Sequence, residues 1–259
     1  MAKATKTRLV DAIRKKGTFE AQRLFFHLFP DTDEIWTGPS ILGGLIEPDQ
    51  VIHGRAGYTK HMEFFREGLT HRERCFMCAN RIGKTLSGGG YETAAHLTGL
   101  YPHWWEGYRF NNPISAWVAG DTYETTRDII QLNLLGELAY SKGRKTVDGR
   151  GVIPGHLLGQ PLWRGGGSNV VDTIPVRHVS GGWSLLGQKS YDQGRKAFQG
   201  TGKHLIWFDE EPPMDVYSEA LIRTATLDGM TMLTFTPLSG LSEVVLSFLP
   251  DELRPDLAA

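Results

Sequence analysis

Short apolar runs alternate with segments of helical period along most of this 259-residue chain. Several of the runs are apolar throughout, which is typical of strands covered on both faces of a sheet. Helical periods follow Lys84 and occupy residues 122–140 and 215–225. The pattern predicts an α/β domain with a mostly parallel central sheet. The expected strands lie at residues 74–79, 114–120, 168–179, 184–190, 204–209 and 231–236.

The N-terminal part of the chain has a different pattern. Two helical periods, at residues 7–16 and 18–29, precede an irregular stretch from Asp31 to Gly57 that is rich in glycine, proline and acidic residues. Residues 58–69 return to a helical period just before the first strand. We therefore divide the chain into an N-terminal helical appendage with its connection, residues 1–56, and an α/β domain, residues 57–259.

Composition and charge narrow the classes of function only slightly. The chain has 40% hydrophobic and 22% charged residues and a formal net charge of −1. This charge argues against a domain that holds nucleic acid by bulk charge alone, although it allows a local basic patch. Because no run of eighteen apolar residues and no secretory signal occur, we expect a cytoplasmic protein without a membrane partner.

Cys75 and Cys78 are the only cysteines, and their CxxC spacing suggests a zinc or redox site. Tetrahedral zinc needs two further ligands, however, and only His71 is near in sequence. On a strand the two side chains would also point to opposite faces of the sheet. We therefore favour two small buried hydrophobic residues.

The segment CANRIGKT, residues 78–85, is similar to the phosphate-binding loop G-x-x-x-x-G-K-[ST], with Cys78 in place of the first glycine. In such a loop the main-chain N–H groups wrap the phosphates, Lys84 reaches the β and γ oxygens, and Thr85 holds Mg²⁺. The alternative is a chance Gly-Lys-Thr in a turn. The predicted nucleotide-binding residues are Asn80, Arg81, Ile82, Gly83, Lys84 and Thr85.

The apolar run at residues 204–209 ends in two adjacent carboxylates, Asp209 and Glu210. Buried like charges raise each other's pKa, so Mg²⁺ near Asp209 is the natural compensation. Glu210 would then orient or deprotonate the water that attacks the γ-phosphate, with Glu211 as the alternative base. The competing interpretation is an acidic turn that leads into Pro212.

Another buried run ends in Thr236, followed by proline. The carboxyl edge of an open α/β sheet is where ligands bind, so Thr236 would hydrogen-bond the γ-phosphate or the attacking water. The alternative is a simple turn at the end of the strand.

In this order the motifs resemble those of the large terminase subunit of tailed bacteriophages, specifically its N-terminal DNA-packaging ATPase domain. The resemblance covers roughly Tyr58 to Phe248 and implies a three-layer, RecA-like P-loop ATPase of the additional-strand class. Such a domain uses ATP and Mg²⁺ to drive double-stranded DNA into a procapsid. Further stretches that look like blocks of that family are HLTGLYPHWWEGYRFNNP, AWVAGDTYETTRDIIQ, GVIP, SYDQGRKAFQG, WFDEEPP and TFTPLSGLSEVV.

The resemblance also implies roles for individual residues. Arg81 in cis and Arg195 in trans are the candidates for an arginine on the γ-phosphate, with a solvated surface charge as the alternative for each. Tyr58 is the candidate for the aromatic residue that contacts adenine, and His61 stands where a glutamine is expected. The residues that take the family's phosphate, metal, catalytic and coupling roles are Lys84, Thr85, Asp209, Glu210 and Thr236.

Further expectations concern partners and extent. The resemblance implies a homo-oligomeric ring on the portal protein of a procapsid, with a monomer as the alternative for the isolated chain, and a small terminase subunit as a second partner. It places the protein in the host cell cytoplasm. Full large subunits continue into an RNase H-like nuclease domain, whereas this sequence stops just past the coupling motif. We therefore expect no nuclease activity from it, and either an isolated ATPase fragment or a naturally split subunit.

The most cation-rich segment of the α/β domain, residues 141–151, is our candidate for a DNA-facing loop, with ordinary solvated charge as the alternative. Its cations are Lys142, Arg144, Lys145 and Arg150. An N-terminal cluster is the rival and would equally suit the small subunit or the portal. That cluster contains Lys3, Lys6, Arg8, Arg14, Lys15 and Lys16.

Gly88, Gly89 and Gly90 interrupt the predicted helix after Lys84. Each costs a helix interior up to about 1 kcal/mol relative to alanine, so we expect a close approach to the sheet or to residues 96–105 in return. We interpret Trp104 and Trp105 as core or subunit contacts, because a duplex offers no unstacked base to stack on.

Two other functions remain open at the level of sequence. The first is a helicase or recombination ATPase that acts on single strands. The second is a non-catalytic, ATP-gated assembly subunit, although a pure binder has no need of the water-orienting carboxylate that Glu210 offers.

Overall fold

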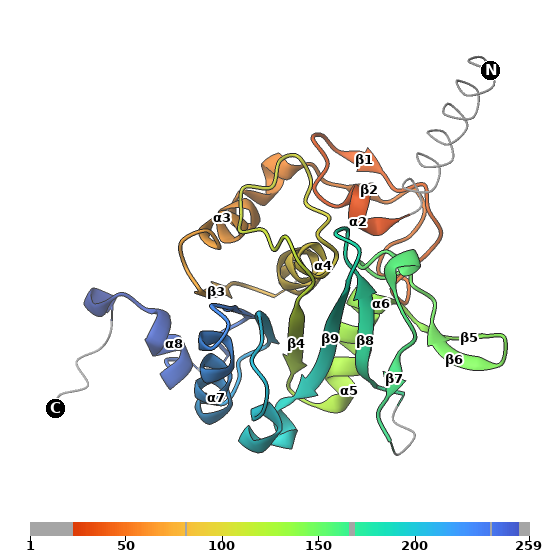
Figure 1. The fold of residues 1–259 in the computed structure, drawn as a ribbon. Helices are drawn as coiled ribbons and strands as arrows, with labels where there is room; N and C mark the ends of the chain where they lie inside the picture. Colours follow the sequence, from red (N-terminus) through yellow and green to blue (C-terminus); the bar gives the residue numbers. More distant parts are fainter. Residues whose placement is uncertain (1–22, 81, 166–168, 239, 254–259) are drawn as a thin grey trace, which may run out of the picture.

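The computed structural model describes residues 23–80, 82–165, 169–238 and 240–253, and its centre is a seven-stranded sheet (Figure 1). The first five strands in the spatial order are parallel to one another. The sixth strand is antiparallel to the fifth, and the seventh is antiparallel to the sixth. The predicted α/β class is confirmed, and each expected strand is present. The order is β3 (Glu73–Met77), β11 (Met230–Phe235), β10 (Leu205–Asp209), β4 (Ser115–Gly120), β9 (Trp183–Ser190), β8 (Val171–Arg177) and β7 (Leu162–Trp163).

The position of β11 sets the class of the fold. It lies between β3, which leads into the phosphate-loop motif, and β10, which ends in Asp209. This inserted strand is the additional strand that the resemblance implied. Because β3, β11 and β10 are parallel, their carboxyl ends meet at one edge of the sheet, where ligands of open α/β sheets bind.

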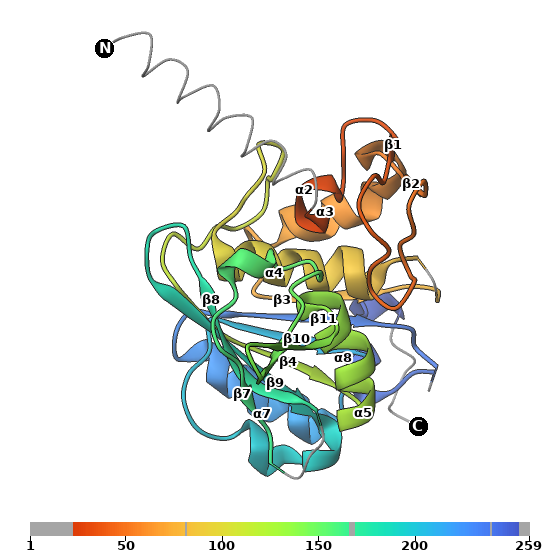
Figure 2. The ribbon, with the colours of Figure 1, turned by 90° about the vertical axis from the view of Figure 1, so that its right-hand side faces the viewer.

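Helices cover both faces of the sheet (Figure 2). Along β10, Trp207 belongs to the core on one face, whereas Phe208 belongs to the core on the other. The Trp207 face is covered by α3 (Thr59–Glu67), by a π-helical segment (Lys84–Gly90) that runs into α4 (Tyr91–Thr98), and by the helical residues 123–135. The Phe208 face is covered by α7 (Met214–Ala225) and α8 (Glu243–Phe248). None of the helices in the described ranges is both long and apolar enough to cross a membrane.

The predicted close approach to the sheet is found at Gly89, where a Cβ atom would lie 2.1 Å from Cε2 of Trp207. A Cβ atom at Gly90 would instead lie 2.7 Å from the carbonyl oxygen of Thr85, within the same helical segment. Trp105 is buried and stacks on Phe65, with 4.9 Å between ring centroids, which confirms the predicted core role for this residue. Trp104 is half-buried and packs against the same core.

The N-terminal segment is joined to the same core. Within its described part, α2 (Leu24–His27) and the hairpin of β1 (Glu34–Ile35) and β2 (Val51–Ile52) pack on the Trp207 face. Phe25 stacks on Tyr91 of α4 at 4.8 Å between ring centroids. The predicted helix at residues 7–16 lies outside the described residues.

The predicted helix over residues 122–140 is too long. It consists of α5 (Tyr123–Thr125), a π-helical stretch (Thr126–Gln131) and α6 (Leu132–Leu135), and it stops at Gly136, which has a φ of +89°. The following residues form a hairpin, β5 (Leu138–Ser141) with β6 (Arg144–Val147). Lys142 and Gly143 both have positive φ, as the tight turn of a two-residue hairpin requires. The predicted loop is therefore mainly a β-hairpin.

The two cysteines pack against the core but are only half-buried, whereas the sequence predicted that both would be buried. Both are free, and Cys75 packs with the Phe208 face whereas Cys78 packs with the Trp207 face. Burial raises the pKa of both thiols. Among the described residues, no group of three or more His, Cys, Asp or Glu side chains is arranged to hold a metal ion by itself.

Candidate active site

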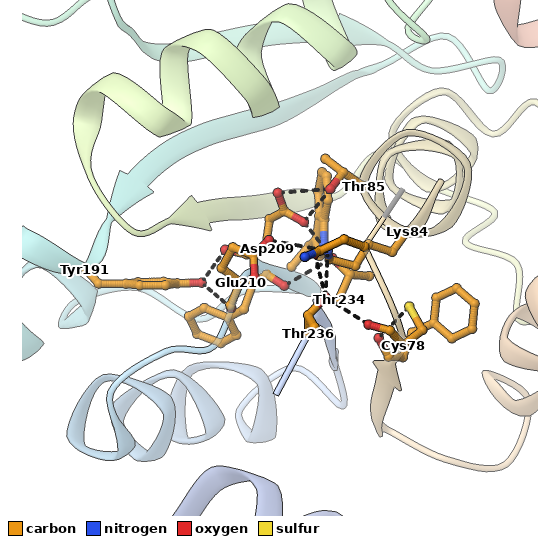
Figure 3. A network of polar contacts seen from close by, with 12 residues as sticks. Cys78, Lys84, Thr85, Tyr191, Asp209, Glu210, Thr234 and Thr236 are labelled. Carbon is orange, nitrogen blue, oxygen red and sulfur yellow. Dashed lines mark hydrogen bonds and ion pairs between the residues drawn. The ribbon is translucent and has the colours of Figure 1, made fainter. Parts of the chain in front are cut away.

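Three motifs from separate parts of the sequence meet around the ammonium group of Lys84 (Figure 3). Lys84 is buried and follows Gly83, whose φ of +84° is a backbone conformation that favours glycine. Its Nζ donates to Oγ1 of Thr236 at 3.1 Å and to Oδ1 of Asn80 at 3.3 Å, and it lies 3.5 Å from Oε1 of Glu210. The phosphate-loop motif, the acidic strand end and the Thr-Pro strand end therefore form one site.

Thr236 connects the end of β11 to the start of the phosphate loop. Its Oγ1 lies 2.8 Å from the carbonyl oxygen of Cys78 and 2.9 Å from Oδ1 of Asn80. The hydroxyl has one proton for these two acceptors and a free lone pair for the Lys84 ammonium. The side chain of Asn80 takes part in the site as well as its main chain, which the loop motif alone did not indicate.

Asp209 is the buried carboxylate of the site. Thr85 donates to its Oδ1 at 2.9 Å, and Thr234 of β11 donates to the same oxygen at 2.8 Å. Trp207 in turn donates to Thr234 at 2.8 Å, which fixes the direction of that hydroxyl. Burial raises the pKa of Asp209 to about 7, although the two hydroxyl hydrogen bonds act in the opposite direction.

The surroundings of Asp209 fit a divalent cation. A buried carboxylate whose partners are neutral hydroxyls lacks full charge compensation, and the nearby Glu210 carboxylate raises its pKa further. Thr85 and Asp209 offer adjacent hard oxygen ligands. Mg²⁺ is commonly held by one or two protein oxygens together with water and phosphate, so a small protein donor set suits it.

Glu210 has a different environment from its two neighbours in the sequence. Its φ of +65° turns the chain at the end of β10, and its side chain is 45% exposed while Oε1 faces Lys84. Its main-chain N–H donates to the carbonyl oxygen of Thr234 at 3.0 Å. Glu211 instead accepts a hydrogen bond from Ser242. The carboxylate that faces both the lysine and the solvent is therefore Glu210.

A cavity of about 570 Å³ opens beside the phosphate loop. Residues 83–87 of the loop line one end, and Tyr58 lies on its wall. The structure thus brings the predicted aromatic residue and the predicted phosphate loop to the same cavity. Its remaining walls come from Leu28, Leu45, Ile46, Gln50, Val51, Ile52, His53 and Asn133. For the six of these residues that lie between Leu45 and His53, the sequence pattern of the irregular segment gave no sign of a place at a cavity.

Of the two candidate arginines, only Arg195 lies within the described residues. Arg81 lies outside the described residues, whereas its neighbour Ile82 is exposed. Arg195 follows β9 on the α7 side of the sheet, and its Nε donates to Oε2 of Glu219 at 2.9 Å. Glu219 also accepts from Arg223 at 3.1 Å. In this conformation Arg195 is therefore held by α7.

The candidate DNA-facing cations lie on or beside the β5–β6 hairpin, which projects from the body of the molecule (Figure 1). Lys142 and Arg144 are exposed at its tip and have no ion-pair partner within the described part of the chain. Lys145 lies over the Trp163 ring, 4.1 Å from its centroid, and Nε of Arg150 lies 3.7 Å from Asp148. The rival N-terminal cluster falls outside the described residues.

Comparison with known proteins gives one family and a small set of relatives. A family model for the N-terminal part of the terminase large subunit, of the T4-like-virus type, matches residues 75–259. The terminase large subunit of Salmonella phage P22 is 38% identical over 220 residues, which cover 77% of this chain and 42% of that protein. The chain therefore spans about two fifths of the length of this curated relative.

Two solved structures are similar at lower identity. A mutant of the large terminase ATPase domain of Thermus phage P74-26 is 17% identical with a TM-score of 0.39, over 65% of this chain and 61% of that one. The large terminase of a thermophilic bacteriophage in complex with ADP is 14% identical with a TM-score of 0.41, over 68% of this chain and 37% of that one.

Proposed function

The chain belongs to the family of bacteriophage terminase large subunits, and from this premise we propose that it is an ATPase motor domain that hydrolyses Mg-ATP to move double-stranded DNA into a procapsid. The observation that carries the proposal is the set of contacts around Lys84. One buried ammonium lies within 3.5 Å of Asn80, Thr236 and Glu210, beside the Thr85–Asp209 pair.

In the proposed complex the phosphates lie against the loop of residues 80–85, and the base and ribose enter the adjoining cavity toward Tyr58. Lys84 takes the β and γ oxygens. Thr85 and Asp209 would hold Mg²⁺, which when bound neutralises charge on the phosphates.

Glu210 orients the attacking water or removes its proton. In the structure its carboxylate lies 3.5 Å from Nζ of Lys84. An arriving γ-phosphate competes for that lysine, because a phosphate carries more negative charge than a carboxylate. Binding of ATP therefore frees Glu210 for the water at the moment when a substrate is present. Thr236 is hydrogen-bonded to Lys84 and Asn80, where it would contact the γ-phosphate. Loss of this phosphate on hydrolysis would then change the hydrogen bonds at the end of β11.

The arginine that completes the site remains part of the proposal. Arg195 would serve a neighbouring subunit, and Arg81 would serve its own. Glu219 holds two arginines, so Arg195 can leave while Arg223 still neutralises that buried carboxylate. An arginine supplied in trans contributes about 10³- to 10⁵-fold to turnover in related chemistry, so an isolated subunit should be a slow ATPase.

Double-stranded DNA, the portal protein and the small terminase subunit are the proposed partners of a ring that works in the host cell cytoplasm. We assign the DNA contact to the hairpin tip, Lys142 and Arg144, because these cations are exposed and not engaged in ion pairs within the described residues. Lys145 and Arg150 already have partners within the chain, Trp163 and Asp148 respectively. Contacts of this kind hold phosphates without reading sequence, as a packaging motor requires.

Steady-state release of phosphate from ATP, with and without Mg²⁺, tests the proposal. Glu210→Gln should abolish turnover while ATP binding is kept, and Lys84→Ala should weaken binding itself. Glu211→Gln is the matched control, since its side chain faces Ser242, and it should retain turnover. A larger loss in Glu211→Gln than in Glu210→Gln would overturn the assignment of the base.

A further inference from the structure

Tyr191 lies directly behind the catalytic turn, although no role has been given to it above. It follows β9 and is only 5% exposed. Its hydroxyl lies 2.9 Å from the carbonyl oxygen of Asp209 and 3.0 Å from that of Glu210 (Figure 3). A third carbonyl oxygen, that of Ala119, lies 3.2 Å away.

The strand order explains why a residue from β9 reaches this point. β4 separates β9 from β10, so the Tyr191 side chain passes the end of β4 and meets the end of β10. Carbonyl groups at strand ends lose their ladder partners, and buried ones need another donor. The Tyr191 hydroxyl has a single proton to donate, and all three of these oxygens lie within its reach.

The residue is well anchored for this role. The main-chain N–H of Tyr191 donates to the carbonyl oxygen of Asp121 at 3.1 Å, and its ring packs on Phe208 with 5.9 Å between centroids. Ser190 and Gln193 form reciprocal hydrogen bonds across the short turn that Tyr191 begins. The hydroxyl is thus placed from β9 independently of the turn it contacts.

Glu210 needs such support because of its backbone. A non-glycine residue in the left-handed region is strained by about 1–2 kcal/mol, and it persists where its surroundings hold it. On one side of its Cα, the N–H of Glu210 is held by Thr234; on the other, its carbonyl oxygen is held by Tyr191. Fixing both peptide groups fixes the direction in which the carboxylate leaves the chain, which is toward Lys84.

We propose that Tyr191 is a positioning residue for Glu210, holding the strained turn so that the carboxylate is aimed at the attacking water. The inference rests on the proposed ATPase function. It also gives the SYDQGRKAFQG segment a role in the reaction besides the one proposed for Arg195, because Tyr191 is its second residue.

The test compares two buried tyrosines of the same core. Tyr191→Phe removes the hydroxyl and keeps the ring. Tyr217→Phe is the matched control, because its hydroxyl donates to Glu73 at 2.8 Å and its ring also packs on Phe208. We expect Tyr191→Phe to lower kcat about tenfold with the ATP Kd unchanged within about twofold, since a small misplacement of a catalytic group lowers kcat more than binding. Tyr217→Phe should keep kcat within about twofold of the wild type.

The comparison with Tyr217→Phe separates positioning from general stability, because each substitution removes one buried hydroxyl from the same core and only Tyr191 contacts the Glu210 turn. Wild-type kcat in Tyr191→Phe, or an equal loss in Tyr217→Phe, would overturn the inference. Failure of the proposed function has a different result, namely wild-type turnover no higher than that of Glu210→Gln.

A second readout does not depend on turnover. In a crystal structure of Tyr191→Phe we expect residue 210 to leave the left-handed region and its carboxylate to move away from Lys84. If φ of Glu210 stays near +65° and Oε1 stays about 3.5 Å from Nζ, the inference is wrong whatever the activity.

Discussion

Asp209 and Glu210 are adjacent in the chain, yet the sheet gives them opposite environments. Asp209 is 3% exposed among hydroxyl groups, whereas the Glu210 side chain is 45% exposed and faces a lysine. The first environment suits an ion ligand and the second suits a group that acts on water. Two identical functional groups thereby acquire different surroundings from a single turn of the backbone.

This difference predicts distinct effects of neutral substitutions on metal dependence. In Asp209→Asn, Mg²⁺ should no longer tighten ATP binding, with a loss of about tenfold or more, because a charged ligand contributes about 1.5–3 kcal/mol. Glu210→Gln should keep the full effect of Mg²⁺ on binding. Calorimetric titration with ATP, in Mg²⁺ or in EDTA, measures both. An intact Mg²⁺ effect in Asp209→Asn would contradict the assignment of the metal ligand.

His61 predicts a pH dependence of stability. Burial lowers its pKa from 6.5 to about 4, in an aromatic cluster that includes Tyr58 and Phe76. The unfolded chain therefore binds this proton at a higher pH than the folded one, so the stabilisation is present above pH 6.5 and is lost as the pH falls toward 4. The loss from this group is about 2 kcal/mol between pH 7 and pH 5.

His61→Phe keeps an aromatic ring in the cluster and removes the titration. Urea unfolding at the two pH values should show that the variant loses about 2 kcal/mol less than the wild type on acidification. An equal pH dependence in the two proteins would show that His61 does not titrate as its burial indicates.

At this scale the sequence predicted the motif residues that meet in the candidate site but not the residues that hold them in place. The motif residues Lys84, Thr85 and Asp209 could be named from their spacing alone. Thr234 and Tyr191 could not, because their contacts depend on strand register and strand order. Asp209 is paired with Thr234 across β10 and β11, and this pairing places the hydroxyl on the carboxylate.

At the scale of elements, the helix after the phosphate loop owes its position to one glycine more than to its neighbours. A Cβ at Gly89 would meet the Trp207 ring at 2.1 Å, whereas one at Gly88 would make an ordinary contact of 3.4 Å with Phe76. Gly89→Ala should therefore destabilise the protein by about 1–3 kcal/mol through overpacking.

Gly88→Ala provides the matched control on the same helix. It should be neutral or stabilising by up to about 1 kcal/mol, because alanine is the better helix former and space is available. Urea midpoints of the two variants measure the difference. Equal destabilisation of both would contradict the proposed close approach of this helix to β10.

The β5–β6 hairpin is the element where the sequence prediction was wrong. Apolar residues continue past Leu135, so the helical period seemed to extend to Tyr140. The signals that outweigh this period are glycines at positions where φ is positive, Gly136 and Gly143. Both glycines are visible in the sequence, and glycine at such positions ends a helix or forms a tight turn.

The proposed DNA contact of the hairpin predicts how the affinity for DNA depends on salt concentration. If Lys142 and Arg144 each neutralise one DNA phosphate, the double alanine variant should reduce the slope of log affinity against log salt concentration by about two. Arg177→Ala, an exposed cation at the end of β8 that lies over Trp183, is the control and should leave the slope unchanged. Equal slopes for wild type and double variant, measured by anisotropy with labelled duplex DNA, would exclude the hairpin tip.

At the scale of the whole molecule, strand order and the cavity beside the phosphate loop depend on contacts between distant parts of the chain. Periodicity predicted the strands, but it carries no information on their order in the sheet, and the position of β11 came from the resemblance. The sequence pattern of residues 45–53 indicates an irregular connection, yet six residues of this segment line the cavity beside the phosphate loop. Their role follows from the packing of the N-terminal segment on α3 and α4, which no local pattern encodes.

ATP hydrolysis in Mg²⁺ tests the proposed motor function most directly. The rate is measured without DNA, with linear duplex DNA and with single-stranded DNA, for the wild type and for Glu210→Gln and Lys84→Ala. We predict slow turnover that duplex DNA raises and both substitutions abolish. Stronger stimulation by single strands would favour a helicase or recombination ATPase. Turnover that never exceeds the Glu210→Gln level, despite tight ATP binding, would contradict the motor and favour an ATP-gated assembly subunit.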